Sequence, residues 1–295
     1  MNNKLIIDIG MHKGEDTGYY LQNGYTVIAV DADPNLIAEA KTKFKKAYNS
    51  KQLMLLNYAI SDKDGTKVTF NLSQNTIWNS LKENIADRAH LSKNSIVVET
   101  RTLSSIIAEY GAPFYCKIDI EGYDEVCLQT LKQANELPQF ISVETECVGE
   151  GETITDEEAL GTLYRLKELG YTKFKLVDQT SFRVLTLKED FHTSSDKALK
   201  FLSQSFGARL KRKIQSTLGL AGDMDETYFK ERKAIEKQFN YNFMVGSSGP
   251  FGSDLKGEWQ NFDEAKQTLL KHRHDYFNLD NAVNYGFWCD WHATK

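Results

Sequence analysis

The stretch Leu5-Ile6-Ile7-Asp8-Ile9-Gly10-Met11-His12-Lys13-Gly14 decides the fold expected for this chain. A strand of apolar residues ends at Asp8, a glycine turn follows, and a helix begins after Gly14 with Glu15 and Asp16 in its first turn. The two glycines allow a ligand to approach the backbone closely. The order strand, turn and helix therefore predicts a nucleotide-binding corner at the carboxyl end of the first strand.

A second short apolar run narrows the kind of nucleotide. Tyr25-Thr26-Val27-Ile28-Ala29-Val30 predicts a strand, and Asp31 follows at its carboxyl end. An acid at this position can accept hydrogen bonds from both hydroxyls of a ribose. The interval from Gly10 to Gly14 departs from the G-x-G-x-x-G pattern of dinucleotide sites. We therefore expect a smaller nucleoside ligand without a pyrophosphate.

Composition is that of an ordinary globular protein. The chain has 295 residues, of which 41% are hydrophobic and 26% are charged, with a net charge of −5. An excess of acid does not suit the wrapping of nucleic acid, whose affinity comes from neutralising phosphates, although a local basic patch stays open. No nucleic-acid partner is expected.

The sequence also indicates a compartment. It passes from Met1 directly into a strand without a signal-peptide pattern, and no apolar run approaches the roughly 20 residues that cross a bilayer. The cysteines are scattered without the spacing of a zinc site, which indicates reduced thiols. They are Cys116, Cys127, Cys147 and Cys289. We expect a cytoplasmic protein that does not associate with membranes.

Strand and helix patterns alternate along most of the chain, which predicts an α/β fold with a mostly parallel sheet and helices on both faces. Asp33 and Pro34 have the residue types of a helix start. Helices are also expected over 103–110, 123–132, 156–169 and 262–272, and the segment 75–95 is expected to form a loop and a short helix. Strands are expected at 5–9, 25–30, 53–57, 67–72, 96–100, 114–119, 140–144 and 242–245.

Residues 187–239 interrupt this alternation. Apolar residues three or four apart between Leu199 and Leu218 predict an amphipathic helix or a broken pair, with a basic opposite face. We expect one domain of residues 1–186 plus 240–295 and a late helical insertion at 187–239. The basic face fits either a solvated surface or a lid over an anionic acceptor.

Several motifs together resemble the FkbM family of S-adenosylmethionine-dependent methyltransferases. The resemblance covers about Leu5 to Glu144 and, more loosely, the segment around Gly249-Pro250-Phe251-Gly252. The motifs are Asp8-Ile9-Gly10-Met11-His12-Lys13-Gly14, Val30-Asp31-Ala32-Asp33-Pro34, Ala59-Ile60-Ser61-Asp62, Arg101-Thr102-Leu103, Lys117-Ile118-Asp119-Ile120-Glu121-Gly122 and Ser142-Val143-Glu144.

The resemblance implies S-adenosylmethionine as the cofactor and a seven-stranded Rossmann-like sheet whose last strand is antiparallel. It implies that Asp8 and Gly10 line the methionine end of the cofactor and that Asp31 holds the ribose hydroxyls. Ala32 would pack on the adenine, and Ile60 and Asp62 would flank it. The other turn residues are cofactor-side candidates, with a structural or solvated role as the alternative: His12, Lys13 and Gly14.

Three acids at or just beyond strand ends are candidates for catalysis: Asp119, Glu121 and Glu144. Methyl transfer to an alcohol needs a group that aligns the acceptor and removes its proton, and a carboxylate can do both. By resemblance, Asp119 lies nearest the sulfonium. The alternatives are that Asp119 only binds the cofactor amino group and that Glu121 only caps a helix.

Two further features stay open. The three acids also suit a divalent cation, but nothing fixes a ligand count, so a metal is not favoured. Asp290 and His292 are spaced to face alike in a strand, and Trp288 and Trp291 suit either a sugar-binding wall or an ordinary packed terminus.

The function expected from these features is methyl transfer from S-adenosylmethionine to a hydroxyl of a saccharide or related metabolite. One alternative is a non-catalytic partner protein that binds S-adenosylmethionine or a nucleotide sugar. A nucleic-acid methyltransferase is the weaker alternative, because the chain lacks an N-P-P-Y type motif. The partner expected is a small hydroxylated acceptor, and a homo-oligomer stays open.

Overall fold

The computed structural model describes residues 2–72, 94–120, 122–145, 154–188, 223–244, 246–278 and 288–295. Several expectations fall outside these ranges. They are the loop and short helix at 75–95 over all but its last two residues, the candidate Glu121, Cys147, and the 189–222 part of the expected insertion.

The centre of the molecule is an eight-stranded sheet with the strand order β10-β9-β11-β8-β7-β1-β2-β3. The strands β3, β2, β1, β7 and β8 are parallel neighbours, whereas β11 is antiparallel to both β8 and β9. In chain order the strands are β1 Asn2–Ile9, β2 Thr26–Asp31, β3 Leu53–Asn57, β7 Pro113–Ile118, β8 Phe140–Glu144, β9 Lys173–Asp178, β10 Arg183–Leu185 and β11 Cys289–Thr294.

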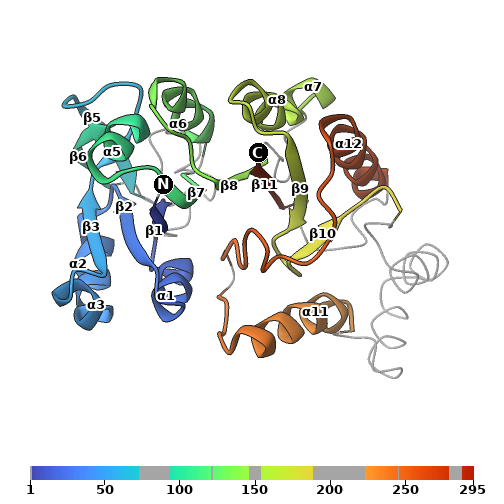
Figure 1. Cartoon of the computed structure of the whole chain (residues 1–295), viewed down its shortest axis with the longest axis horizontal. Coiled ribbons are helices and arrows are strands. Elements are labelled where there is room, and N and C mark those ends of the chain that lie inside the picture. Colours follow the sequence, from blue (N-terminus) through green and yellow to red (C-terminus); the bar gives the residue numbers. More distant parts are fainter. Residues whose placement is uncertain are drawn as a thin grey trace.

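A smaller three-stranded sheet lies beside the β3 edge of the main sheet (Figure 1). It has the order β4-β6-β5, in which β6 is parallel to β4 and antiparallel to β5. Its strands are β4 Ala59–Ile60, β5 Lys67–Leu72 and β6 Asn94–Arg101.

Helices cover both faces of the main sheet (Figure 1). One layer packs its apolar side chains into a single core cluster, and its helices are α5 Leu103–Tyr110, α6 Asp124–Thr130, α7 Asp156–Ala159, α8 Gly161–Glu168 and α12 Phe262–Asn278. The 3₁₀ turn η2 Leu131–Gln133 continues α6. The other layer packs against a second cluster, and its helices are α1 Glu15–Gln22, α2 Pro34–Lys43, α3 Lys45–Asn49 and α11 Asp223–Phe239.

The two core clusters follow from the alternation of side chains along a strand. In β1, Ile7 and Ile9 belong to the first cluster and Ile6 to the second. In β7, Cys116 belongs to the first and Tyr115 to the second. Strands buried on both faces are those of a sheet that lies between two helical layers.

The direction of the chain across the sheet reverses between β1 and β7. The first strands run β1, β2, β3 toward one edge, and the later strands β7 and β8 run toward the other. Such a reversal is the topological switch point at which ligands of open α/β sheets bind, at the carboxyl ends of the strands. The turn after Ile9 and the residues after Ile118 both lie there.

The expected α/β class is confirmed, and the last strand, β11, is antiparallel as expected. The sheet has eight strands instead of the expected seven. The additional strand is β10, a short antiparallel edge strand that pairs with β9 through Arg183 and Leu185. The start of α2 is also confirmed, since the Asp33 side chain accepts a hydrogen bond from the Asn35 N–H and Pro34 is the first helical residue.

Two local expectations were wrong. Asn242–Met244 is not a strand, because the carbonyl groups of Phe243 and Met244 accept hydrogen bonds from the Arg232 guanidinium instead of from a neighbouring strand. The helix expected over 156–169 breaks at Leu160 into α7 and α8.

Among the described residues, no helix is both long and apolar enough to cross a bilayer. Cys116, Cys127 and Cys289 are buried, and none of the three forms a disulfide bond among the described residues.

Candidate active site

The turn after β1 brings three chain segments together. The N–H groups of Gly10 and Met11 both donate to the carbonyl oxygen of Val30, at 3.0 and 3.1 Å, which ties the turn to the end of β2. Gly10 has φ +78°, and a Cβ at this residue would lie 1.8 Å from the carbonyl oxygen of Asp119. Glycine is therefore required at residue 10 by the close approach of the chain after β7.

The Asp31 carboxylate is fixed at the end of β2 by two backbone groups. Its Oδ2 accepts a hydrogen bond from the His12 N–H and its Oδ1 accepts one from the Asp33 N–H, both at 2.9 Å. Each carboxylate oxygen can accept a second bond, so the group keeps capacity for two hydroxyl donors. Burial raises the pKa of Asp31 to about 6, and the two N–H donors oppose this rise.

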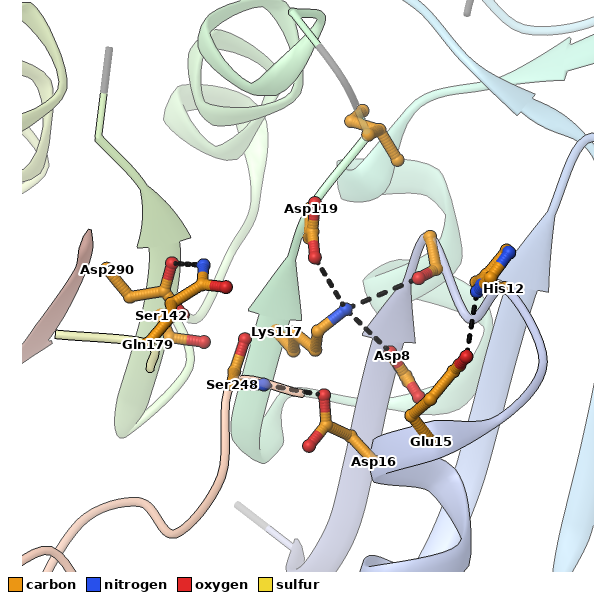
Figure 2. A network of polar contacts seen from close by, with 12 residues as sticks. Asp8, His12, Glu15, Asp16, Lys117, Asp119, Ser142, Gln179, Ser248 and Asp290 are labelled. Atoms are coloured by element: carbon orange, nitrogen blue, oxygen red, sulfur yellow. Dashed lines mark hydrogen bonds and ion pairs between the residues drawn. The ribbon is translucent and has the colours of Figure 1, made fainter. Parts of the chain in front are cut away.

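The His12 side chain is held on the same turn. His12 lies in the left-handed region with φ 52°, and its Nδ1 is 2.8 Å from Oε1 of Glu15. Burial works to raise the pKa of Glu15, but the hydrogen bond and charge of His12 outweigh it, and the pKa is lowered. This contact links the turn to Glu15, the first residue of α1 (Figure 2).

A buried lysine joins the ends of β1 and β7 (Figure 2). Lys117 Nζ lies 3.3 Å from Oδ2 of Asp119 and 3.8 Å from Oδ1 of Asp8, and it donates to the carbonyl oxygen of Gly10 at 3.3 Å. Asp8 also accepts a hydrogen bond from the Thr17 hydroxyl at 2.5 Å. Oppositely charged groups thus meet at the switch point.

Lys117 and Asp8 belong to a row of polar residues that crosses the sheet on one face. The strand registers pair Asp8 with Lys117, Lys117 with Ser142, Ser142 with His292, and His292 with Lys175. All five residues are buried. Burying polar groups costs free energy unless they form hydrogen bonds or ion pairs. Apolar packing alone therefore does not explain why these five residues lie in the sheet.

Two further acids face this row from other elements. Asp16 on α1 accepts hydrogen bonds from the N–H groups of Ser248 and Gly249, at 2.9 and 3.2 Å. Asp290 on β11 accepts a short hydrogen bond from the Gln179 side chain. Burial raises the pKa of Asp16 and the pKa of Asp290, each to about 7.

A cleft of about 960 Å³, counting the part open to solvent, lies above these strand ends. Lining residues come from the β1 and β2 ends, the small sheet, the β7 end and the carboxyl-terminal segments. They are Ile9, Gly10, Met11, His12, Glu15, Asp16, Val30, Asp31, Ala32, Leu36, Tyr58, Ala59, Ile60, Phe70, Lys117, Asp119, Ile120, Tyr123, Gly246 and Trp288.

The cleft brings together about half of the residues expected from the sequence. Those that line it are Gly10, His12, Asp31, Ala32, Ile60 and Asp119.

The other expected residues lie elsewhere. Asp8 is fully buried beneath the cleft, and Gly14 packs against the Phe44 ring, where a Cβ would come within 2.5 Å. Lys13 and Asp62 are exposed side chains outside the cleft lining.

Glu144 ends β8, pairs in register with Asp290 and does not line the cleft. Glu121 lies outside the described residues.

Several lining residues had not been singled out. Lys117 interrupts the apolar run of β7, and this charge inside a buried strand was an available signal. The sequence left Trp288 and Trp291 as either a sugar-binding wall or part of a packed terminus. Trp288 lines the cleft, whereas Trp291 is fully buried. Nothing in the sequence alone places Tyr123 or Gly246 beside them.

The described residues contain no group of three His, Cys, Asp or Glu side chains arranged to hold a metal ion.

A doubly wound sheet with a glycine turn, an acid at the end of β2 and a cleft at the switch point is typical of nucleotide-binding proteins of the Rossmann-like class. Over residues 8–172 the sequence matches the family model of the methyltransferase FkbM domain. The chain belongs to the FkbM methyltransferase family, and its cofactor is S-adenosylmethionine.

Solved structures with some likeness to this chain include other methyltransferases. A methyltransferase from Thiobacillus denitrificans in complex with S-adenosylhomocysteine is 12% identical, with coverage of 99% of this chain and 84% of that one, at a TM-score of 0.36. The corresponding complex from Geobacter sulfurreducens is 11% identical, with coverage of 99% and 84%, at a TM-score of 0.35. Precorrin-6y C5,15-methyltransferase from Geobacter metallireducens is 12% identical, with coverage of 59% and 68%, at a TM-score of 0.32. No curated protein matches the sequence.

Proposed function

We propose that the cleft binds S-adenosylmethionine and that the protein methylates a hydroxyl group of a saccharide or a related hydroxylated metabolite. The observation that carries the proposal is the opening of two strand-end carboxylates, Asp31 and Asp119, into one cleft beside the turn at Gly10. One carboxylate suits the ribose of the cofactor, and the other suits an acceptor hydroxyl.

The donor half of the cleft fits a nucleoside. Asp31 keeps the capacity to accept two hydroxyl donors, and the apolar walls beside it suit an adenine ring. Those walls are Ala32, Leu36, Ile60 and Phe70. His12 and Gly10 would face the amino-acid end of the cofactor. For Asp8, Lys13, Gly14 and Asp62, which do not line the cleft, a direct cofactor contact has less support.

The acceptor half of the cleft lies around Asp119. This side chain is 21% exposed, so an acceptor can reach it. Its Oδ2 lies 3.3 Å from Nζ of Lys117. Tyr123 and Trp288 line the same region. An aromatic face beside a carboxylate suits a sugar ring, whose C–H groups pack on the aromatic ring while a hydroxyl donates to the acid.

When bound, the cofactor supplies an activated methyl group, so the protein must orient the acceptor and take up its proton. We assign both tasks to Asp119, which we propose as the general base. Glu121 stays a second candidate because it follows Asp119 closely in the chain. A role for Glu144 has less support because this side chain does not line the cleft.

We also propose that residues 187–239 act as a lid or an interface attached to a methyltransferase domain of residues 1–186 plus 240–295. The support is the break in the strand and helix alternation at residue 187. At the end of this segment, Phe239 packs edge-on against Tyr19 of α1 with ring centroids 5.7 Å apart. The segment would thus join the body of the protein close to the turn that forms the cleft.

Transfer of an isotopically labelled methyl group to a panel of saccharides and other hydroxylated metabolites tests the reaction. We expect labelled methyl ether on at least one acceptor. Asp119→Asn should lower kcat at least about 100-fold, the usual contribution of a general base. The control is Asp263→Asn, which changes an exposed acid at the start of α12 and should leave kcat unchanged.

Two results would contradict the proposal. Binding of the cofactor without transfer to any hydroxyl in the panel would favour a non-catalytic binding protein. Transfer to RNA or DNA in preference to the small acceptors would favour the nucleic-acid alternative.

A further inference from the structure

The charged side chains that line the cleft are mostly acidic. Four of them carry a carboxyl group: Glu15, Asp16, Asp31 and Asp119. Among the described residues that line the cleft, Lys117 is the only lysine or arginine. Its Nζ lies 3.3 Å from Oδ2 of Asp119, so this cation already has a partner within the chain (Figure 2). The described walls therefore offer more acidic than basic groups to a ligand.

Three of these acids have pKa values that leave them charged at pH 8. Burial works to raise the pKa of Glu15, but the hydrogen bond and charge of His12 outweigh it and lower the pKa. Burial raises the pKa of Asp31 to about 6 and that of Asp16 to about 7. All three values lie below 8, so the acidic character of the cleft does not depend on Asp119.

Backbone N–H groups, which bind anions in many proteins, are already in use around the cleft. The Asp31 carboxylate accepts hydrogen bonds from two of them and the Asp16 carboxylate from two more, at 2.9 to 3.2 Å. In the segment after β7, the Asp124 side chain accepts from the N–H groups of Ile120 and Gly122, both at 3.1 Å. Three loops at the cleft thus direct N–H donors at carboxylates of the chain itself.

The N-terminus of α1 is also unsuited to an anion. The partial positive charge at a helix N-terminus attracts phosphates and carboxylates. In α1 the first turn carries Glu15 and Asp16, and both side chains line the cleft. A phosphate placed at this helix end would meet two acids.

We propose that the cleft takes acceptors without a negative charge and rejects those with a phosphate or carboxylate group near the reacting hydroxyl. This inference rests on the proposed function, because it names the class of acceptor that the same cleft would methylate. The bound cofactor does not remove the excess of acid. Its sulfonium, ammonium and carboxylate groups sum to a single positive charge, so the cofactor and Lys117 together offset two of the four acids.

The consequence for specificity follows from electrostatics. Like charges that face each other in a site shielded from water repel strongly. A sugar phosphate should therefore be methylated with a kcat/KM at least about tenfold below that of the same sugar without phosphate.

The test compares acceptors that differ in charge. Transfer of a labelled methyl group from S-adenosylmethionine is measured at pH 8 for glucose, galactose and mannose, for their 6-phosphates and for the corresponding uronic acids. Each uronic acid has nearly the size of its parent sugar, so this comparison separates charge from size. We expect both charged forms of any accepted sugar to show the lower kcat/KM. Any other acceptor found in the panel above is compared with its own phosphate ester.

Variants connect the preference to the acids of the cleft. Asp16→Asn removes a charge and keeps the shape of the side chain, and it should narrow the preference for the uncharged sugar at least about threefold. Glu15→Gln should narrow it in the same way and replaces Asp16→Asn if that variant does not fold. Asp263→Asn, the exposed acid of α12, should leave the preference unchanged. The ratio of two acceptors on one enzyme does not change with the amount of folded protein.

The outcomes separate this inference from the proposed function. Equal or faster methylation of the charged sugars would overturn the inference alone and favour the anionic acceptor that the basic face of residues 187–239 would suit. An unchanged preference in folded Asp16→Asn or folded Glu15→Gln would overturn it as well. No methyl transfer to any hydroxyl, in these sugars or in the wider panel, would overturn the proposed function and this inference with it.

Discussion

Single buried acids set the pH behaviour of this protein. Asp290 is 2% exposed on β11, and burial raises its pKa to about 7 from the usual value near 4. Between about pH 4 and pH 7, the Asp290 carboxyl group keeps its proton in the folded protein but has released it in the unfolded chain. The contribution of this acid to stability is therefore largest at low pH and falls as the pH rises toward 7.

Replacement of Asp290 by asparagine removes this ionisation without changing the shape of the side chain. We expect Asp290→Asn to be more stable than the wild type at pH 8 by about 2 kcal/mol, and the difference to vanish near pH 4. Urea unfolding at both pH values measures it. Asp263→Asn, an exposed acid, should show no such pH dependence, and a destabilised Asp290→Asn at pH 8 would show that the charged form is needed for folding.

Residue types predicted part of the site because their chemistry is local. Asp31 could be assigned to the cleft from its place after a strand, and Asp119 from its place after another. Asp16 and Trp288 could not, since their position depends on segments far away in the chain. The Asp16 carboxylate, for example, is held by N–H groups 232 and 233 residues later.

At the scale of elements, the turn between β1 and α1 is constrained by space and not only by conformation. Gly10 and Gly24 have nearly the same backbone, with φ +78° and +80°. A Cβ on Gly10 would collide with the carbonyl oxygen of Asp119, whereas a Cβ on Gly24 would meet nothing within 4 Å. The two positions therefore separate backbone strain from collision.

Gly24→Ala should cost only the strain of a left-handed alanine, about 1 kcal/mol. Gly10→Ala should cost at least about 4 kcal/mol, because β7 must also move away from the turn. Chemical denaturation of the two variants measures both values. Similar losses for the two would mean that the contact between the turn and Asp119 is not as close as the structure has it.

One guanidinium group of α11 contacts both the segment that follows β9 and the segment that follows α11. Arg232 is 4% exposed and donates to four carbonyl groups, those of Gln179, Thr180, Phe243 and Met244. It also stacks over the Phe182 ring, 4.5 Å from its centroid. This single side chain explains why 242–244, although apolar in pattern, is not a strand.

Arg232→Met should destabilise the protein by about 3 kcal/mol or more, because buried carbonyl groups lose charged donors. Thermal unfolding should show the loss, and hydrogen exchange should increase around 241–244. The neighbouring exposed lysine provides the control, since Lys233→Met should change neither. Unchanged exchange in Arg232→Met would contradict the anchoring role.

For the whole molecule, the sequence predicted the class of fold well because each strand and helix carries its own periodicity. The β2 and β7 strands appear as apolar runs that lead into acids at the cleft, Asp31 and Asp119. The number of strands was less certain, because β10 is only three residues long and too short for periodicity to define. The placement of β11 between β8 and β9 depends on long-range pairing that no local pattern contains.

The polar row across the sheet also depends on long-range strand pairing that no local sequence pattern contains. Each member is a single polar residue in an apolar strand, and only the registers of five strands place Asp8, Lys117, Ser142, His292 and Lys175 side by side. A ligand site at the switch point follows from the topology, but the charge balance within it follows from these registers.

The central claim is that the cleft binds the cofactor through the acid at the end of β2. Titration calorimetry with S-adenosylhomocysteine on the wild type and Asp31→Ala tests it most directly, with Glu39→Gln on the exposed face of α2 as the control. The account predicts saturable binding by the wild type and the control, and a loss of at least about 100-fold in Asp31→Ala, since two hydroxyl hydrogen bonds to a charged acceptor disappear. Equal affinity of wild type and Asp31→Ala, or no binding by the wild type at millimolar ligand, would contradict it.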